Sequence, residues 1–245
     1  MGTGRIERRL FRDRRELSRQ AARLICTILG EAVQSRGSAG FVLAGGTTPK
    51  ILYPLLASQE YRDTIPWGKV DFFWGDERHV PPDHEMSNYR MARETLLDRL
   101  PVDPSTIHAI PTQNPDPSAC AQLYENMLRS SFTGPAPSFD VLLLGMGTDG
   151  HIASLFPGTA DDDQGKWVAV TTSPAPPHTR LSLTLPVINA SRNIIVLVSG
   201  RGKSEIVGRV FNGPKMSPEV PASMISPEGN LFWFLDRDAA SALKT

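Results

Sequence analysis

The stretch of residues 139–158, FDVLLLGMGTDGHIASLFPG, constrains the fold more than any other part of the chain. It opens with a continuous apolar run at residues 141–144, a length typical of a strand buried on both faces of its sheet. Glycines follow, and glycine allows the positive φ angles and the close backbone approach of a ligand-binding turn. Asp149 and His151 come next. Ligands bind at the carboxyl ends of strands in open α/β sheets, so this stretch predicts an α/β fold with an ionisable imidazole in its site.

The same stretch also matches a dinucleotide-binding pattern. Residues 145–150 read G-M-G-T-D-G, which fits G-x-G-x-x-G after a strand. A nicotinamide or flavin site would need an acid at the end of the next strand, about 20 residues further on. The next strand candidate, residues 167–171, ends in threonines, and the acids at 161–163 come too early, in a polar loop. This interpretation is therefore disfavoured, and the simplest structural alternative is a tight turn with a structural histidine.

Composition excludes several broad classes of protein. The chain has 245 residues and a formal net charge of 0, which argues against nucleic-acid binding and against a membrane surface. No apolar run approaches the roughly 20 residues needed to span a bilayer. The two cysteines, Cys26 and Cys120, have no metal-binding spacing, so a reducing cytoplasm is the simplest compartment. Without a repeat or a low-complexity linker, residues 1–245 are predicted to form one domain. The oligomeric state stays open between a monomer and a weak dimer.

Short apolar runs alternate with helical patterns along the chain. Strands are predicted at residues 5–11, 41–44, 70–74, 141–144, 167–171, 181–185, 194–198 and 231–235. Helices are predicted at residues 16–33, 49–56, 87–100, 117–132 and 203–211. Pro54 is expected to kink the second helix or end it early. This alternation predicts a mostly parallel sheet with helices on both faces. The arginines within the first helix are expected to form a solvated face.

Polar or glycine-containing loops follow four of the predicted strands, at residues 45–48, 76–79, 149–151 and 200–203. The carboxyl ends of parallel strands meet at one edge of a sheet, so these loops are expected to build one site. The first loop, Gly-Gly-Thr-Thr, leads into a helix whose free N–H groups favour an anion. The alternative is an ordinary turn with a threonine cap.

Basic residues strengthen the prediction of an anion site. Lys203 lies at a second predicted helix start, where a positive charge is unfavourable unless an anion accompanies it. Arg78 follows a buried strand and can bind a phosphate or a carboxylate in bidentate fashion. Arg180 begins another strand. The alternatives are surface salt bridges at residues 75–78 and a solvated side chain at Arg180.

Several of these motifs together resemble the 6-phosphogluconolactonase family. They are LAGGTTP at 43–49, GDERHVP at 75–81, SNY at 87–89, the stretch 145–158, RLSLT at 180–184 and GRGK at 200–203. The resemblance covers residues 40–235. It implies a Rossmann-like fold shared with glucosamine-6-phosphate deaminase. It also implies hydrolysis of 6-phospho-D-glucono-1,5-lactone in the oxidative pentose phosphate pathway, with a sugar phosphate as substrate and with neither a metal nor an organic cofactor.

Two alternatives remain within the resemblance. Deaminases carry an Asn-Glu pair shortly after the Asp-Gly-His element, where this chain has Ser-Leu-Phe-Pro at residues 154–157. This difference favours the lactonase, although Asp76 falls where deaminases keep a catalytic aspartate. The second alternative is a sugar-phosphate sensor without chemistry, but no DNA-binding segment is visible.

The expected mechanism begins with His151 as the general base that activates a water molecule. Either Asp149 or Asp76 would orient the imidazole. The N–H groups of residues 145–150, or Arg78, would stabilise the oxyanion. No G-x-S-x-G elbow is present, so no acyl-enzyme is expected. The residues expected to hold the phosphate are Gly45, Gly46, Thr47, Thr48, Arg180 and Lys203.

Overall fold

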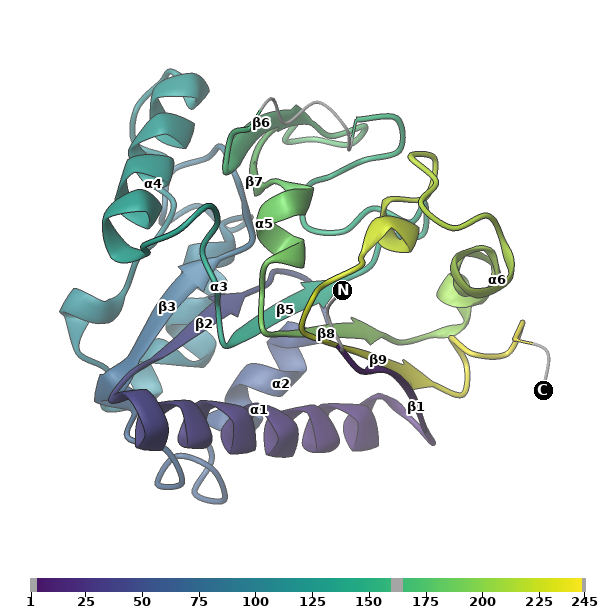
Figure 1. Cartoon of the computed structure of the whole chain (residues 1–245), viewed down its shortest axis with the longest axis horizontal. Helices are drawn as coiled ribbons and strands as arrows, with labels where there is room; N and C mark the ends of the chain where they lie inside the picture. Colours follow the sequence, from purple (N-terminus) through teal and green to yellow (C-terminus); the bar gives the residue numbers. More distant parts are fainter. Residues whose placement is uncertain (1–3, 160–164, 244–245) are drawn as a thin grey trace.

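The computed structural model describes residues 4–159 and 165–243, which contain two β-sheets (Figure 1). The larger sheet has six strands in the order β1-β9-β8-β5-β2-β3, and every neighbouring pair is parallel. The smaller sheet is antiparallel, in the order β4-β7-β6. The strands are β1 (Ile6–Phe11), β2 (Ala39–Leu43), β3 (Val70–Trp74), β4 (Asp76–Arg78), β5 (Val141–Gly145), β6 (Val168–Thr172), β7 (Thr179–Leu183), β8 (Asn193–Val198) and β9 (Asn230–Asp236).

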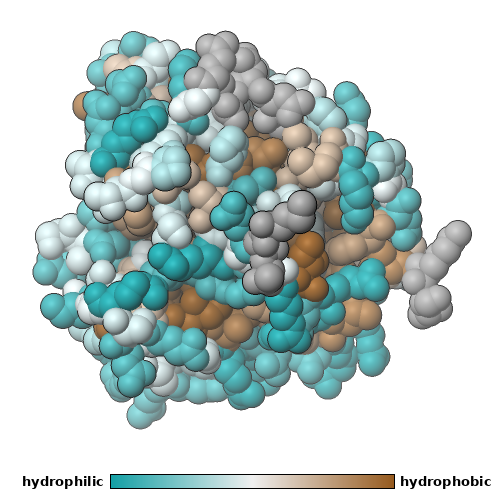
Figure 2. Space-filling view, viewed as in Figure 1, coloured by the Kyte–Doolittle hydropathy of each residue, from teal (hydrophilic) through white to brown (hydrophobic). Residues whose placement is uncertain are grey.

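Helices lie on both sides of the larger sheet, as the sequence predicted. The α-helices are α1 (Arg14–Arg36), α2 (Pro49–Leu56), α3 (Asn88–Thr95), α4 (Pro117–Ser131), α5 (Leu185–Asn189) and α6 (Ser204–Asn212). In Figure 1, α1 and α2 lie below the six-stranded sheet, whereas α5 and the small sheet lie above it. Within the described residues, no helix is both long and apolar enough to cross a membrane. Figure 2 shows a mostly polar face on which apolar residues surface in separate patches.

Local sequence signals set the ends of the first two helices. The Asp13 carboxylate accepts the Glu16 N–H at 2.9 Å and caps the start of α1, while Gly37 takes the left-handed conformation (φ 84°) that ends it. Pro49 opens α2, because its missing N–H would have no partner in the first turn. Pro54 lies inside α2, which ends two residues later. The helix thus covers the whole predicted range, residues 49–56, and the early end that Pro54 suggested is not found.

Two predicted strands belong to the small sheet and not to the parallel one. The expectation that residues 167–171 and 181–185 would join the parallel sheet is wrong, because β6 and β7 pair antiparallel. Only residues 173–178 separate them, and a parallel pairing needs a crossover of a dozen residues or more. The sequence also missed α5 and assigned residues 76–78 to a loop, whereas they form β4 and pair with β7.

The centre of the large sheet creates the place for a site. The strand β5 lies between β2 and β8, and its apolar residues are buried. From β2 the sheet continues to β3 on one side, and from β5 it continues to β8 and β9 on the other. The direction in which successive strands are added therefore reverses between β2 and β5. Such a reversal leaves a crevice at the carboxyl ends of these two strands, where open α/β sheets bind ligands. The acids at 161–163, considered for a dinucleotide site, lie outside the described residues.

Candidate active site

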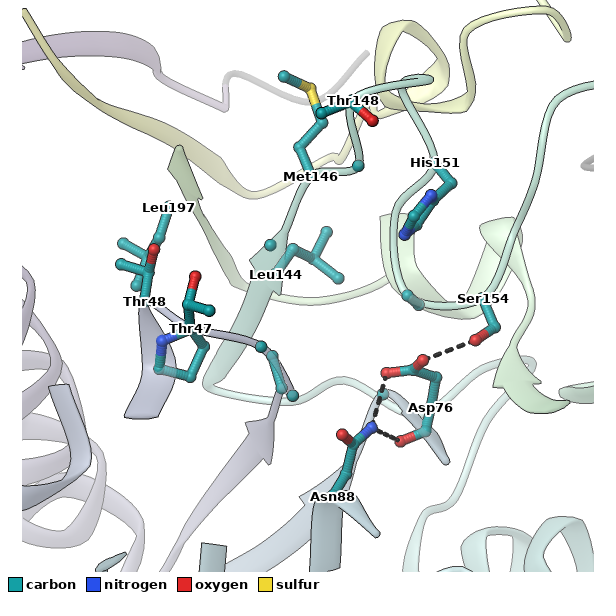
Figure 3. A pocket seen from close by; sticks show the side chains of 18 of the residues that line it. Thr47, Thr48, Asp76, Asn88, Leu144, Met146, Thr148, His151, Ser154 and Leu197 are labelled. Atoms are coloured by element: carbon teal, nitrogen blue, oxygen red, sulfur yellow. Dashed lines mark hydrogen bonds between the residues drawn. The ribbon is translucent and has the colours of Figure 1, made fainter. Parts of the chain in front are cut away.

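A cleft of about 500 Å³ opens at the carboxyl ends of β2, β5 and β8 and extends to the small sheet (Figure 3). The structure brings together in its lining all ten residues that the sequence singled out. These are Gly45, Gly46, Thr47, Thr48, Asp76, Arg78, Asp149, His151, Arg180 and Lys203. The convergence of four loops on one site is therefore found in the structure.

His151 is paired with Asp149 at the end of β5. The imidazole Nδ1 lies 2.6 Å from Asp149 Oδ1, which also accepts the His151 backbone N–H at 3.1 Å. Burial opposes ionisation of Asp149, but its bonds to His151 outweigh burial and lower the pKa of the carboxyl below its ordinary value of 3.8. Among the described residues, the imidazole Nε2 has no hydrogen-bond partner. A base with this nitrogen free can take a proton from a water molecule in the cleft.

A glycine makes this pairing possible. A Cβ atom on Gly147 would lie 2.2 Å from His151 Nδ1 and 2.3 Å from Asp149 Oδ1, so any side chain there would displace the pair. The Gly147 N–H also donates to the His151 carbonyl at 2.8 Å, and Gly150 takes a positive φ of 89°. The glycine turn therefore leaves the space in which the His151 imidazole and the Asp149 carboxylate pair.

The N–H groups of this turn are partly engaged already. The amides of Gly147 and Gly150 donate within the turn, and that of His151 donates to Asp149. These three donors cannot stabilise a substrate oxyanion without rearrangement. The turn thus offers fewer oxyanion donors than the sequence suggested.

Asp76 lies elsewhere in the cleft and has different partners. Its Oδ2 accepts the Ser154 hydroxyl at 2.6 Å, and the Asn88 amide donates to its backbone oxygen at 2.9 Å (Figure 3). Within the described part of the chain, no hydrogen bond joins Asp76 to His151. The acid in contact with the imidazole is therefore Asp149 and not Asp76.

Glu77 organises the wall beside Asp76, and the sequence did not identify this role. Its side chain is only 2% exposed, and its two oxygens accept hydrogen bonds from four groups. The donors are the N–H groups of Arg78, Asn88 and Tyr89, at 2.7–2.8 Å, and the Ser87 hydroxyl, at 3.1 Å. Burial raises the pKa of Glu77, and the backbone donors oppose this shift. The alternative of surface salt bridges at residues 75–78 is therefore wrong for this residue.

Two arginines lie side by side on neighbouring strands of the small sheet. Arg78 of β4 stands opposite Arg180 of β7, and both line the cleft. Arg180 is 8% exposed and donates from Nη2 to Ser173 Oγ at 3.3 Å, so it is not the solvated side chain of the alternative interpretation. Burial and the charge of Arg78 lower the pKa of Arg180, against the opposing effect of Asp76 and Glu77.

The Nε atoms of these two arginines are buried and have no hydrogen-bond partner among the described residues. Buried side-chain donors without a hydrogen-bond partner are uncommon in folded proteins, and each calls for a physical explanation. Ser173, which holds Arg180, was also missed by the sequence. Two adjacent cations with unused donors suit an anionic ligand.

The opposite side of the cleft carries hydroxyl groups. Figure 3 shows Thr47 and Thr48 across the cleft from His151. Thr48 is the N-cap residue of α2, although its side chain makes no capping bond, and its Oγ1 lies 3.0 Å from Ser199 Oγ. The first turn of α2 offers no free backbone donor: Pro49 has no N–H, and the N–H groups of Lys50 and Ile51 already donate to the carbonyls of Gly46 and Thr48. The expectation of free N–H groups at this helix start is therefore wrong, and the hydroxyls are what this side of the cleft offers an anion.

The loop at residues 200–203 differs in part from the expected second helix start. Arg201–Lys203 forms a 3-10 turn, and α6 begins at Ser204. The Gly200 N–H is already bound to both carboxylate oxygens of Asp236 at 3.0 Å. Burial lowers the pKa of Lys203, with Asp149 partly opposing this shift, and no carboxylate lies within 4 Å of it in the described chain. Lys203 therefore remains available to pair with an anion.

No group of three or more histidine, cysteine or acidic side chains in residues 4–159 and 165–243 is arranged to hold a metal ion. Both cysteines are free and buried.

Comparison with known proteins places the chain in a family. The sequence profile described as "Glucosamine-6-phosphate isomerases/6-phosphogluconolactonase" matches residues 12–233. The chain belongs to this family. The resemblance seen in the motifs is thereby confirmed, and the match extends further toward the N-terminus than the motifs did.

Individual relatives agree with this assignment. The 6-phosphogluconolactonase of Synechocystis sp. is 42% identical over 227 residues, which cover 90% of this chain and 92% of the relative. That of Mycobacterium tuberculosis is 40% identical over 242 residues, which cover 96% and 97%. The structure of 6-phosphogluconolactonase from Trypanosoma brucei superposes with a TM-score of 0.85 at 31% identity and covers both chains fully. The predicted α/β architecture is thus confirmed.

Proposed function

We propose that the protein hydrolyses 6-phospho-D-glucono-1,5-lactone to 6-phosphogluconate, a step of the oxidative pentose phosphate pathway. The observation that carries this proposal is the His151–Asp149 pair, whose free Nε2 faces a cleft with anion-binding groups on its other sides. Relatives with about 40% identity over most of the chain are named for this activity.

His151 acts as the general base. Its Nε2 takes a proton from water as the water oxygen forms a bond to the lactone carbonyl carbon, and the carbonyl oxygen becomes an oxyanion. The bond between this carbon and the ring oxygen then breaks, and His151 returns the proton to the ring oxygen. Asp149 holds the imidazole so that Nε2 faces the cleft and stabilises the imidazolium. Arg78 is the cation assigned to the oxyanion, since several amides of the glycine turn are engaged.

The 6-phosphate lies against residues 45–48, with Arg180 and Lys203 as its counter-charges. The lowered pKa of Lys203 supports this placement, because a buried ammonium without a carboxylate partner gains stability when an anion binds beside it. The hydroxyl groups of Thr47 and Thr48 add hydrogen-bond donors. Binding energy from this remote group holds the carbonyl near His151.

The deaminase alternative needs more acid–base groups than this cleft offers beside His151. Phe156 packs against the imidazole, with ring centroids 4.8 Å apart, in the segment where deaminases carry an acid. Asp76 is held by Ser154 and Asn88. Lactone hydrolysis by His151 needs no proton transfer by Asp76, whereas ring opening and isomerisation need a further acid–base group.

One assay tests the proposal. Fresh 6-phosphogluconolactone is added to the purified protein, and acid release is compared with spontaneous hydrolysis. We expect catalysed release with the lactone and no ammonia from glucosamine 6-phosphate. Steady ammonia production would support the deaminase, and the absence of both activities would support a sugar-phosphate sensor.

The compartment is proposed to be a reducing one, as expected for the cytoplasm. Two buried, free cysteines are consistent with it. One relative, from Arabidopsis thaliana, is named chloroplastic, so the family itself does not fix the compartment.

A further inference from the structure

Arg14 lies at the start of α1, before residues 16–33, which the sequence predicted as helical, and it differs from the exposed Arg15 beside it. Its side chain is partly buried and turns toward the end of β8, where Nε donates to Ser199 Oγ at 2.8 Å. Ser199 lines the cleft, and its hydroxyl lies 3.0 Å from Thr48 Oγ1. Arg14 does not line the cleft itself. A chain of two hydrogen bonds thus joins it to the proposed phosphate end.

We propose that Arg14 is a positioning residue for the anionic group of the substrate, acting through Ser199 and Thr48. This inference rests on the proposed function and adds a residue to it. The direction of the hydrogen bonds carries the first argument. A guanidinium can only donate, so Ser199 Oγ accepts from Arg14 and keeps its own hydrogen for Thr48. Thr48 can then direct its hydrogen into the cleft.

A phosphate dianion only accepts hydrogen bonds, which makes this direction the useful one. If Thr48 donated to Ser199 instead, it would present a lone pair to the phosphate and repel it. The bond from Arg14 favours an arrangement in which Ser199 donates to Thr48 and Thr48 donates to the phosphate. Each hydrogen bond in such a series polarises the next. Arg14 therefore sets the orientation of the hydroxyl that meets the ligand.

Charge supplies the second argument. No carboxylate lies within 4 Å of Arg14 in the described chain, whereas nearby Arg9 pairs with Glu7 and Arg12 with Asp13. The Arg14 Nη2 lies 3.6 Å from the position that a Cβ on Gly200 would take. The guanidinium is therefore next to the loop at residues 200–203, which carries Lys203. A partly buried charge that has no ion pair within 4 Å is weakly screened and attracts an anion in the cleft.

The test compares two substrates in four single variants. We expect Arg14→Ala and Ser199→Ala each to raise KM for the phosphorylated lactone about tenfold, within the range for a hydrogen bond to a charged group, and to leave kcat within about twofold. Kinetics on unphosphorylated glucono-1,5-lactone are expected to stay unchanged. Arg15→Ala is the matched control, because Arg15 is the exposed neighbour on the same helix. Arg14→Lys is expected to recover part of the lost affinity.

A double-mutant cycle separates the relay from two independent effects. If Arg14 acts through Ser199, the double variant raises KM less than the product of the two single changes. Equal damage to both lactones, full additivity, or an unchanged KM would each overturn the proposal. Thermal unfolding checks that each variant is folded, and Ser199→Ala tests the relay if Arg14→Ala does not fold. An inactive wild-type protein would instead reject the proposed function.

Discussion

At the scale of single residues, the site depends on how one imidazole is held. Asp149 binds Nδ1 of His151, which fixes the ring and leaves Nε2 for the substrate. Gly147 leaves the space that the pair needs. The sequence predicted His151 from its place after β5, but it could not choose between Asp149 and Asp76. Both acids follow a strand, and only the three-dimensional contacts distinguish them.

Removing the imidazole tests its role. We expect His151→Ala to lower kcat by roughly 10²–10⁴, the usual contribution of a general base, with little change in KM. Steady-state kinetics on the phosphorylated lactone measure both. Near-normal kcat in a folded variant would show that another group activates the water.

Lys203 is expected to act on binding. A contact with the phosphate is similar in the ground state and the transition state, so its loss appears in KM. We expect Lys203→Ala to raise KM for the phosphorylated lactone and to leave kcat within about tenfold, because a charged hydrogen bond contributes about 1.5–3 kcal/mol. Glucono-1,5-lactone, which lacks the phosphate, is the control substrate. Equal losses on both lactones would assign Lys203 to the chemistry or to the fold.

At the scale of elements, Glu77 joins β4 to the start of α3. Its carboxylate accepts two N–H groups from the first turn of α3, those of Asn88 and Tyr89, and the same turn carries the Asn88 side chain to Asp76. The neighbouring strand position is Arg78, whose N–H also binds Glu77. One buried carboxylate thus holds in place the backbone that carries Arg78 and Asn88, and both of these residues line the cleft.

Glu77→Ala is expected to destabilise the fold by roughly 2–4 kcal/mol, because it leaves several buried donors without an acceptor. Urea unfolding measures this change. Glu77→Gln, which keeps an acceptor oxygen of the same size, is the matched control and is expected to lose less stability. If the alanine variant is as stable as the wild type, the four hydrogen bonds of Glu77 do not anchor α3.

Most of the large sheet could be predicted from the sequence, and the small sheet could not. Buried apolar runs such as residues 141–144 identify strands, and the helices between them imply parallel pairing. The same kind of run at β6 says nothing about which sheet it joins. The short connection at residues 173–178 was the available signal for antiparallel pairing. Glu77 was missed because a run of charged residues does not show that one of them is buried.

At the scale of the whole molecule, the cleft needs both sheets. The large sheet supplies the glycine turn and the threonines, and the small sheet supplies Arg78 and Arg180. We propose that residues 1–245 form one domain, since neither sheet lines the cleft alone. We therefore predict that the substrate spans the two sheets, with its phosphate near α2 and its carbonyl carbon near His151.

The structure of the protein bound to 6-phosphogluconate tests this claim most directly. We predict that the product carboxylate lies within about 3 Å of His151 Nε2 and that the phosphate contacts Thr48 and Lys203. A phosphate found beside His151, or a product bound outside the cleft, would contradict this arrangement of the substrate.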